Sequence, residues 1–185
     1  MFAALLDTCV LWPSRQRDFL LSLAVVNLYR PLWSSAILDE LHDHEIEKLV
    51  ERHGLSRSEA EGRAARLIEQ MRSHFDDAEV RNWEPYDGTF GLPDRDDEHV
   101  VAAAVAGHAG AIVTENLKDF PQDKIPPGIE VVEPSEFAAN TVAVVPNWPW
   151  KRRSLWLRGS AIRRSQWMTS SPRFGTATGW TKPSI

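Results

Sequence analysis

The sequence lacks features that would assign it to several common classes of protein. It has a single cysteine, Cys9, which excludes an internal disulfide framework and fits the reducing cytosol. No stretch approaches the roughly 20 consecutive apolar residues that a membrane-spanning helix needs. Residues 1–11 are apolar, but they include Asp7 and lack a basic leader, so they predict a first strand and not a secretion signal. We therefore expect a cytoplasmic protein that does not associate with membranes.

Several catalytic motifs are also missing. No Gly-x4-Gly-Lys pattern occurs, which argues against a phosphate-binding loop of that kind. Cys9 stands where an Asp-x-Asp phosphatase needs its second acid, and without a matched histidine it is better interpreted as a small buried apolar residue. His42 and His44 are two positions apart on a predicted helix and point in different directions, so we expect no zinc pair there.

Acidic residues are absent after Glu136, and this absence divides the chain. All 26 Asp and Glu residues lie at or before that position, whereas 13 of the 21 Lys and Arg residues precede residue 137 and eight follow it. The first part therefore carries a net charge of −13 and the rest +8. We predict a domain at residues 1–140 and a basic, Trp-rich tail at residues 141–185, either poorly ordered or atypical. Loose RNA binding through Trp and Arg side chains is the functional alternative for this tail.

Strand and helix patterns alternate along the first part of the chain. Short apolar runs predict strands at residues 2–6, 30–33, 111–114 and 129–132. Helical spacing relates two sets of residues, Phe19, Leu20, Leu23 and Val26, and later Val101, Ala104, Val105 and His108. Capping residues predict helix starts at Ser34 or Ser35, at the Ser56–Glu59 capping box, at Asp94 and at Ser135. The alternation predicts an α/β three-layer sandwich with a mostly parallel sheet flanked by helices.

Asp7 is the first candidate for a catalytic or metal-binding acid. It follows an apolar run at the carboxyl end of the first predicted strand, where open α/β sheets bind ligands. Burying a carboxylate there costs several kcal/mol unless it is paired or bound to a metal. The alternative is that Asp7 caps the following helix or pairs with Arg15 or Arg17.

Two further acids lie on predicted helices. Glu40 is early in its helix, near the edge of the apolar face, and the alternative role is a solvated acid paired with His44. Asp97 lies four residues before Val101 and so shares the buried face of its helix, with Asp94 one turn earlier. For these two aspartates the alternative is a favourable interaction with the helix dipole.

The fourth acidic site follows the strand at residues 111–114. Glu115, Asn116 and Asp119 occupy the loop after Thr114, again at the carboxyl end of a strand. Three separate carboxylates at one edge of a sheet, with oxygen ligands only, suit Mg²⁺ or Mn²⁺. Such an ion polarises a phosphate and activates water for attack on phosphorus.

Four segments that contain these acids resemble successive motifs of PIN domains, over roughly residues 2–138. They are similar above all to the VapC-like toxins of prokaryotic toxin–antitoxin pairs. The segments are Leu5–Leu11 (LLDTCVL), Ile37–Leu41 (ILDEL), Pro93–Ala104 (PDRDDEHVVAAA) and Val113–Pro121 (VTENLKDFP).

The resemblance implies a Mg²⁺-dependent endoribonuclease, with Mn²⁺ as a second option for the ion. It assigns catalysis and metal binding to Asp7, Glu40 and Asp97. The further candidates, with less support, are Asp94, Thr114, Asn116 and Asp119. Many PIN domains carry Asp where this chain has Asn116, which cannot supply a full negative charge, so the number of bound metals, one or two, stays open.

The resemblance also bears on partners. RNA is the expected substrate, a cognate antitoxin protein is the expected inhibitor, and a homodimer is a further option. The competing interpretation is a PIN-fold module that binds RNA or a partner protein but has lost catalysis. Asn116 and the unusual tail favour that alternative, whereas the presence of Asp7, Glu40 and Asp97 argues against it.

Overall fold

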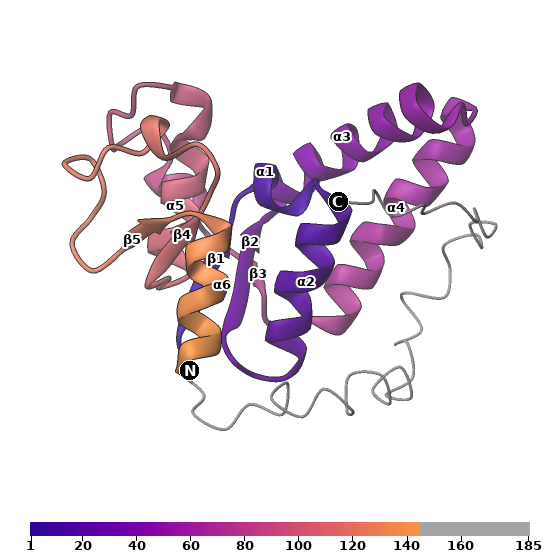
Figure 1. Ribbon diagram of the computed structural model, residues 1–185. Coiled ribbons are helices and arrows are strands. Elements are labelled where there is room, and N and C mark those ends of the chain that lie inside the picture. The colour runs from indigo at the N-terminus through magenta and orange to yellow at the C-terminus, as the bar shows by residue number, and fades with distance from the viewer. Residues whose placement is uncertain (145–185) are drawn as a thin grey trace, which may run out of the picture. The chain divides into compact units, whose positions relative to one another are not determined.

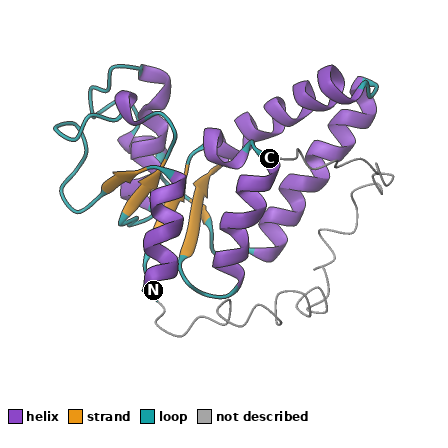
Figure 2. Ribbon diagram, in the orientation of Figure 1, coloured by secondary structure: helices purple, strands orange, loops and turns teal. Residues whose placement is uncertain are grey.

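The computed structural model describes residues 1–144, so most of the predicted tail lies outside the described residues. The chain alternates between strands and helices (Figures 1 and 2). The strands are β1 (Ala3–Leu6), β2 (Arg30–Ser34), β3 (Glu79–Val80), β4 (Ala111–Val113) and β5 (Glu130–Val132). The helices are α1 (Thr8–Leu11), α2 (Ser14–Val25), α3 (Ser35–His53), α4 (Arg57–His74), α5 (Glu98–Ala106) and α6 (Pro134–Ala143). Three short 3₁₀ turns are η1 (Glu84–Tyr86), η2 (Arg95–Asp97) and η3 (Leu117–Asp119).

The strands form one sheet in the order β3-β2-β1-β4-β5, and every neighbouring pair is parallel. Leu5 of β1 pairs with Leu32 on one side and with Ile112 on the other. All four residues of β1 are buried, as expected for a central strand covered on both faces. The predicted α/β sandwich with a parallel sheet is confirmed. β3 was not predicted, because a strand of two residues leaves no periodic pattern.

The order of the strands explains the layers. The chain moves from β1 to β2 to β3 in one direction and then returns through α5 to β4, on the other side of β1. Because such crossovers are right-handed, the return places α5 on the face opposite to α2. Figure 1 shows α2 and α6 in front of the sheet, and Tyr29, which follows α2, packs edge-on against Phe137 of α6. The strand order reverses between β1 and β4, and the crevice at such a switch point is where ligands bind in α/β sheets.

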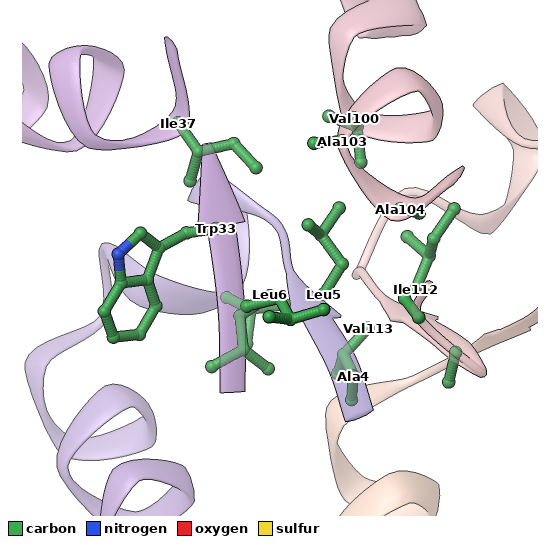
Figure 3. Packing of buried hydrophobic residues seen from close by; sticks show 14 of the residues in the cluster. Ala4, Leu5, Leu6, Trp33, Ile37, Val100, Ala103, Ala104, Ile112 and Val113 are labelled. Carbon is green, nitrogen blue, oxygen red and sulfur yellow. The ribbon is translucent and has the colours of Figure 1, made fainter. Parts of the chain in front are cut away.

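The core fills the space between the sheet and its helices (Figure 3). α5 contributes small side chains, so it can approach the central strands closely. A second, smaller cluster joins α3 to α4. Residues 1–144 contain no helix long and apolar enough to cross a membrane.

Two details of the helices differ from the prediction. Leu20 and Leu23 of the predicted apolar stripe are buried, but Phe19 and Val26 are exposed. The buried face of α2 is completed by Leu21 and Ala24. His108 is not part of the fifth helix, because α5 ends at Ala106 and His108 adopts a left-handed conformation with φ of 53°. The other capping predictions for α3 and α4 are confirmed: Ser34 accepts a hydrogen bond from the backbone of Ile37, and the capping box at the start of α4 is present.

Candidate active site

Asp7 lies at the switch point, directly after β1. Its side chain is only 5% exposed. Thr114, directly after β4, donates a hydrogen bond from Oγ1 to Asp7 Oδ2 over 2.7 Å, and Cys9 Sγ donates to the same oxygen over 3.1 Å. Both donors bind Oδ2, so the structure orients this carboxylate and leaves Oδ1 without a protein donor among the described residues.

The structural alternatives for Asp7 are wrong. Its side chain makes no capping hydrogen bond to α1. Arg17 donates to the carbonyl oxygen of Leu11 over 3.2 Å and pairs with Asp18 at 3.6 Å. Within residues 1–144 Asp7 forms no ion pair with Arg15 or any other side chain. The buried carboxylate therefore accepts hydrogen bonds from neutral donors at Oδ2 and forms no ion pair with a Lys or Arg side chain of the described residues.

Cys9 belongs to the site and is not a plain apolar residue. Burial raises the pKa of its thiol to about 12, and the negative charge of Asp7 adds to this effect. The thiol is therefore protonated at neutral pH and acts as a hydrogen-bond donor, not as a nucleophile. Its sulfur lies 3.4 Å from Thr114 Oγ1 and accepts from the backbone N–H of Glu115 at 3.3 Å. The loop after β4 is thus attached to α1, the short helix that follows β1.

Glu40 projects from the first turns of α3 into a second set of hydrogen bonds. Thr8 Oγ1 donates to Glu40 Oε2 over 2.6 Å, and His99 Nε2 lies 3.0 Å from Glu40 Oε1. The predicted alternative partner, His44, instead faces Glu47 at 3.7 Å. Burial raises the pKa of Glu40, but the hydrogen bonds from His99 and Thr8 and the charge of His99 outweigh burial, so the pKa is lowered overall. The side chain is thus held as a carboxylate beside Thr8, the residue that follows Asp7.

Asp97 supplies the third acid, from the turn η2 that leads into α5. Its side chain is partly buried. Burial, followed by the negative charges of Asp7, Asp94 and Asp119, raises the pKa of Asp97 to about 6, and the charge of His99 opposes this rise. The structure therefore gathers the charges of four predicted aspartates near one place. None of the four forms an ion pair with a Lys or Arg side chain in the described part of the chain.

The remaining predicted residues have different placements. Asp94 is exposed, and its Oδ1 accepts from the backbone N–H of Asp96, so it caps the turn η2 and not α5 itself. Asp119 is partly buried in η3. Asn116 is exposed, and its backbone N–H donates to Thr114 Oγ1 over 3.1 Å. Its side chain makes no hydrogen bond with any described residue, so the structure brings Thr114 to Asp7 but gives the Asn116 amide no partner.

The donor set fits a divalent cation, although no ion is part of the structure. Among residues 1–144, no group of three or more His, Cys, Asp or Glu side chains is arranged closely enough to hold a metal ion. Mg²⁺, however, is commonly bound through only one or two carboxylates, with waters and substrate phosphates as its other ligands. Asp7, with one free oxygen and no cationic partner, and Asp97, with a pKa raised by neighbouring acids, meet that requirement. Whether Glu40 joins them as a ligand stays a prediction.

Two residues that the sequence did not single out help to build the site. His99 is the partner of Glu40, and no local pattern marks it, since the two residues lie on different helices, α5 and α3, that are far apart in the sequence. Glu98 is 3% exposed and accepts hydrogen bonds from the backbone N–H groups of Phe90 and Leu92, over 2.8 and 2.7 Å. Glu98 thereby fixes the loop that precedes η2. Glu98 is the last of three consecutive acids, Asp96 to Glu98, and the sequence does not show which of the three is buried.

Comparison with known proteins agrees with this geometry. A family model described as a PIN domain matches residues 3–118, which is more than half of the chain and includes every candidate acid except Asp119. No curated protein matches the chain.

Proposed function

Because the chain belongs to the PIN-domain family, we propose that it is a Mg²⁺-dependent endoribonuclease that hydrolyses phosphodiester bonds in RNA. PIN domains are typically nucleases, and the crevice at the β1–β4 switch point is the place where a sheet of this kind binds its ligand. The observation that carries the proposal is the set of aspartates around Asp97: within residues 1–144 no Lys or Arg ion pair relieves their mutual repulsion, and His99 offsets it only in part.

In this proposal Asp7 and Asp97 hold the ion, and Asp94 and Asp119 add negative charge around it. A divalent ion bound there would polarise the scissile phosphate and lower the pKa of an attacking water. Thr114 and Cys9 hold Asp7 Oδ2, which directs Oδ1 toward the ion.

Glu40 joins Asp7 and Asp97 in the proposed site. Each of its oxygens already accepts one hydrogen bond, from Thr8 or His99, but a carboxylate oxygen has a second lone pair. Glu40 can therefore still bind the ion or a water molecule on it. Arg95 of η2 and Lys118 of η3 are exposed and lie next to the acids in sequence, so we assign them to the phosphates of the RNA.

The described part of the chain is acidic, so broad electrostatic attraction cannot be its way of binding RNA. Local basic side chains and the metal ion would instead have to bind the RNA phosphates. The test is cleavage of a labelled RNA with Mg²⁺, Mn²⁺ or EDTA. We expect cleavage with either ion, none with EDTA, and none by the Asp7→Asn variant.

We further propose that the protein is the toxin of a toxin–antitoxin pair. The antitoxin of such a pair could inhibit the toxin by inserting an Arg or Lys side chain among Asp7, Glu40 and Asp97, where its positive charge would replace the ion. Expression of the chain should then arrest growth, and the gene next to it should encode a small protein that relieves the arrest. Metal titrated into the complex should compete with the inhibitor, and an inhibited complex with full metal occupancy would exclude this mechanism.

The alternative is a PIN-fold module that binds RNA or a partner protein without cleaving it. Asn116 favours it, because an amide replaces the acid that many PIN domains carry and makes no hydrogen bond within residues 1–144. The cleavage assay separates the two functions. A chain that binds RNA at low salt but leaves it intact with both ions present would support the binding module.

A further inference from the structure

His99 contacts the proposed site from α5 through a single hydrogen bond to Glu40. Its side chain is 12% exposed, and its Nε2 atom lies 3.0 Å from Glu40 Oε1. The ring also packs edge-on against Trp83, with ring centroids 6.2 Å apart. Together with Thr8, whose hydroxyl donates to the other oxygen, His99 therefore fixes both oxygens of the Glu40 carboxylate.

The other nitrogen of this ring shows that packing alone does not explain the residue. His99 Nδ1 is buried and has no hydrogen-bond partner among the described residues. A buried polar atom without a partner is unfavourable, and an apolar side chain of similar volume would fill the space without that cost. Trp83, which packs against the hydrophobic core, provides an apolar surface that would accept such a side chain. The benefit of a histidine at this position must therefore come from Nε2 and its contact with Glu40.

The geometry has a direct consequence for the acid site. Thr8 directly follows Asp7 in the chain, so its hydrogen bond to Glu40 holds Glu40 next to Asp7. Thr114 in turn orients the carboxylate of Asp7. His99 is two residues after Asp97, so the same contact ties α3 to the segment that carries the third acid. Losing the donor at His99 would leave Glu40 held by Thr8 through one oxygen only, so its carboxylate could turn relative to the other two acids.

We infer that His99 is a positioning residue, which holds the Glu40 carboxylate in register with Asp7 and Asp97 and so sets the affinity of the site for a divalent ion. This inference rests on the proposed function. Supporting residues around a metal site typically change metal affinity or activity by about 10- to 100-fold when they are replaced. His99 itself touches neither the ion nor the substrate in this arrangement.

The test compares two substitutions in the full chain, with the affinity for Mn²⁺ measured by calorimetry and RNA cleavage measured at saturating Mg²⁺. His99→Leu removes the donor and should weaken Mn²⁺ binding about tenfold or more and lower kcat with it. His99→Gln keeps an N–H donor near the position of Nε2 and should retain both values within about threefold. The matched control is His42→Leu on α3, because His42 pairs only with the adjacent Asp43 and should leave both values unchanged.

A second pair of variants approaches Glu40 from its other oxygen. Thr8→Val removes the hydroxyl with little change of shape and should reproduce the loss of Mn²⁺ affinity, whereas Thr8→Ser should not. If His99→Leu does not fold, this pair shows whether the hydrogen bonds that fix Glu40 set the Mn²⁺ affinity. Wild-type Mn²⁺ affinity in a folded His99→Leu variant would overturn the inference. If His99→Leu is unfolded, wild-type Mn²⁺ affinity in Thr8→Val would overturn it. Equal losses in His99→Leu and His99→Gln would also overturn it, since they would indicate a structural role of the ring.

The proposed function can fail separately. If the wild-type chain binds Mn²⁺ but cleaves no RNA, the nuclease proposal is wrong, and the Mn²⁺ affinities of the variants still decide the role of His99. If the wild-type chain binds no Mn²⁺ at millimolar concentration, both the metal-dependent function and the role of His99 are wrong.

Discussion

The hydroxyl of Thr114 donates to the carboxylate of Asp7 over 2.7 Å, although 107 positions separate the two residues in the chain. The contact forms because β1 and β4 are neighbouring parallel strands and each residue directly follows its strand. A neutral donor leaves the negative charge of Asp7 in place while fixing its orientation. This arrangement is suited to binding a cation and gives Asp7 the first testable role.

Asp7→Asn should reduce RNA cleavage by more than about 100-fold, beyond the range typical of residues that only support a metal ligand. The amide keeps an oxygen that can accept from Thr114, so the fold should survive. Circular dichroism and the melting temperature would check the fold, and cleavage would be measured with Mg²⁺. The matched control is Asp76→Asn, an exposed aspartate just before β3, which should leave cleavage unchanged. A comparable loss in both variants would contradict the assignment.

Asp97→Asn should stabilise the metal-free protein in a pH-dependent way. The pKa of Asp97 is raised to about 6 in the folded chain, because of burial and then of the charges of Asp7, Asp94 and Asp119. The folded state therefore disfavours the carboxylate, and stability falls as the pH rises from about 4 through about 6. In EDTA at pH 7.5 the variant should be more stable by about 1–2 kcal/mol, a value reduced by solvent screening, and at pH 4 nearly unchanged.

The same variant should respond to metal in the opposite way. Mg²⁺ should raise the melting temperature of the wild-type chain, since a ligand that binds only the folded state stabilises it. Asp97→Asn should lose most of that rise. A lower melting temperature for Asp97→Asn in EDTA at neutral pH would show that the carboxylate stabilises the fold.

Cys9 should react slowly with iodoacetamide in the folded protein. Burial, followed by the charge of Asp7, raises the pKa of its thiol to about 12, so at pH 8 the thiolate is on the order of 10³-fold scarcer than in a free cysteine. Mass spectrometry of the labelled protein would give the rate. Unfolding in urea should restore rapid labelling, and Asp7→Asn should speed it in the folded state. Rapid labelling of the folded wild-type chain at pH 8 would exclude this environment for the thiol.

Glu98→Gln should destabilise the fold by about 1–3 kcal/mol, because the amide group would face a backbone N–H that now donates to a carboxylate. Burial raises the pKa of Glu98, but the hydrogen bonds from Leu92, Phe90 and Gly91 and the charge of Arg95 lower it overall. The stabilisation is therefore present above the usual pKa of glutamate and lost as the pH falls through the lowered pKa.

Hydrogen exchange gives a local measurement of the same contact. The amide protons of Phe90 and Leu92 should exchange faster in Glu98→Gln at neutral pH, while amides of the central strand β1 keep their relative protection. In the wild-type chain the same two amides should lose protection on acidification. Unchanged exchange at these positions would show that Glu98 does not hold the loop.

Removal of the basic tail tests the domain prediction. Helix α6 ends at Ala143, three residues past the predicted boundary, so the truncation is best made after Val144. The truncated chain should keep its melting temperature and the proposed metal-dependent cleavage, because the acids proposed to be catalytic all lie before residue 120. Unfolding of the truncated chain would move the boundary of the domain. A steep fall in RNA affinity at low salt would instead assign RNA binding to the tail.

The sequence by itself determined which residues form the central elements. The apolar run before Asp7 and the strand before Thr114 are too continuous for amphipathic elements, a pattern that predicts buried strands of a parallel sheet, as the fold confirms. Local chemistry likewise determined the starts of α3 and α4, since capping depends on residues three positions apart. The candidate acids followed from their place at strand ends and at one helix start.

The tertiary structure alone decided the partners of those acids. Glu40 pairs with His99 and Thr8, not with His44 four residues away, because the fold places donors from α5 and α1 nearer to its carboxylate than the donor on its own helix. Cys9 donates to Asp7 because the fold of α1 brings its thiol within 3.1 Å of that carboxylate. Sequence spacing fixes distances along one element, whereas hydrogen bonds between elements depend on how the sheet and helices pack, which no local pattern contains.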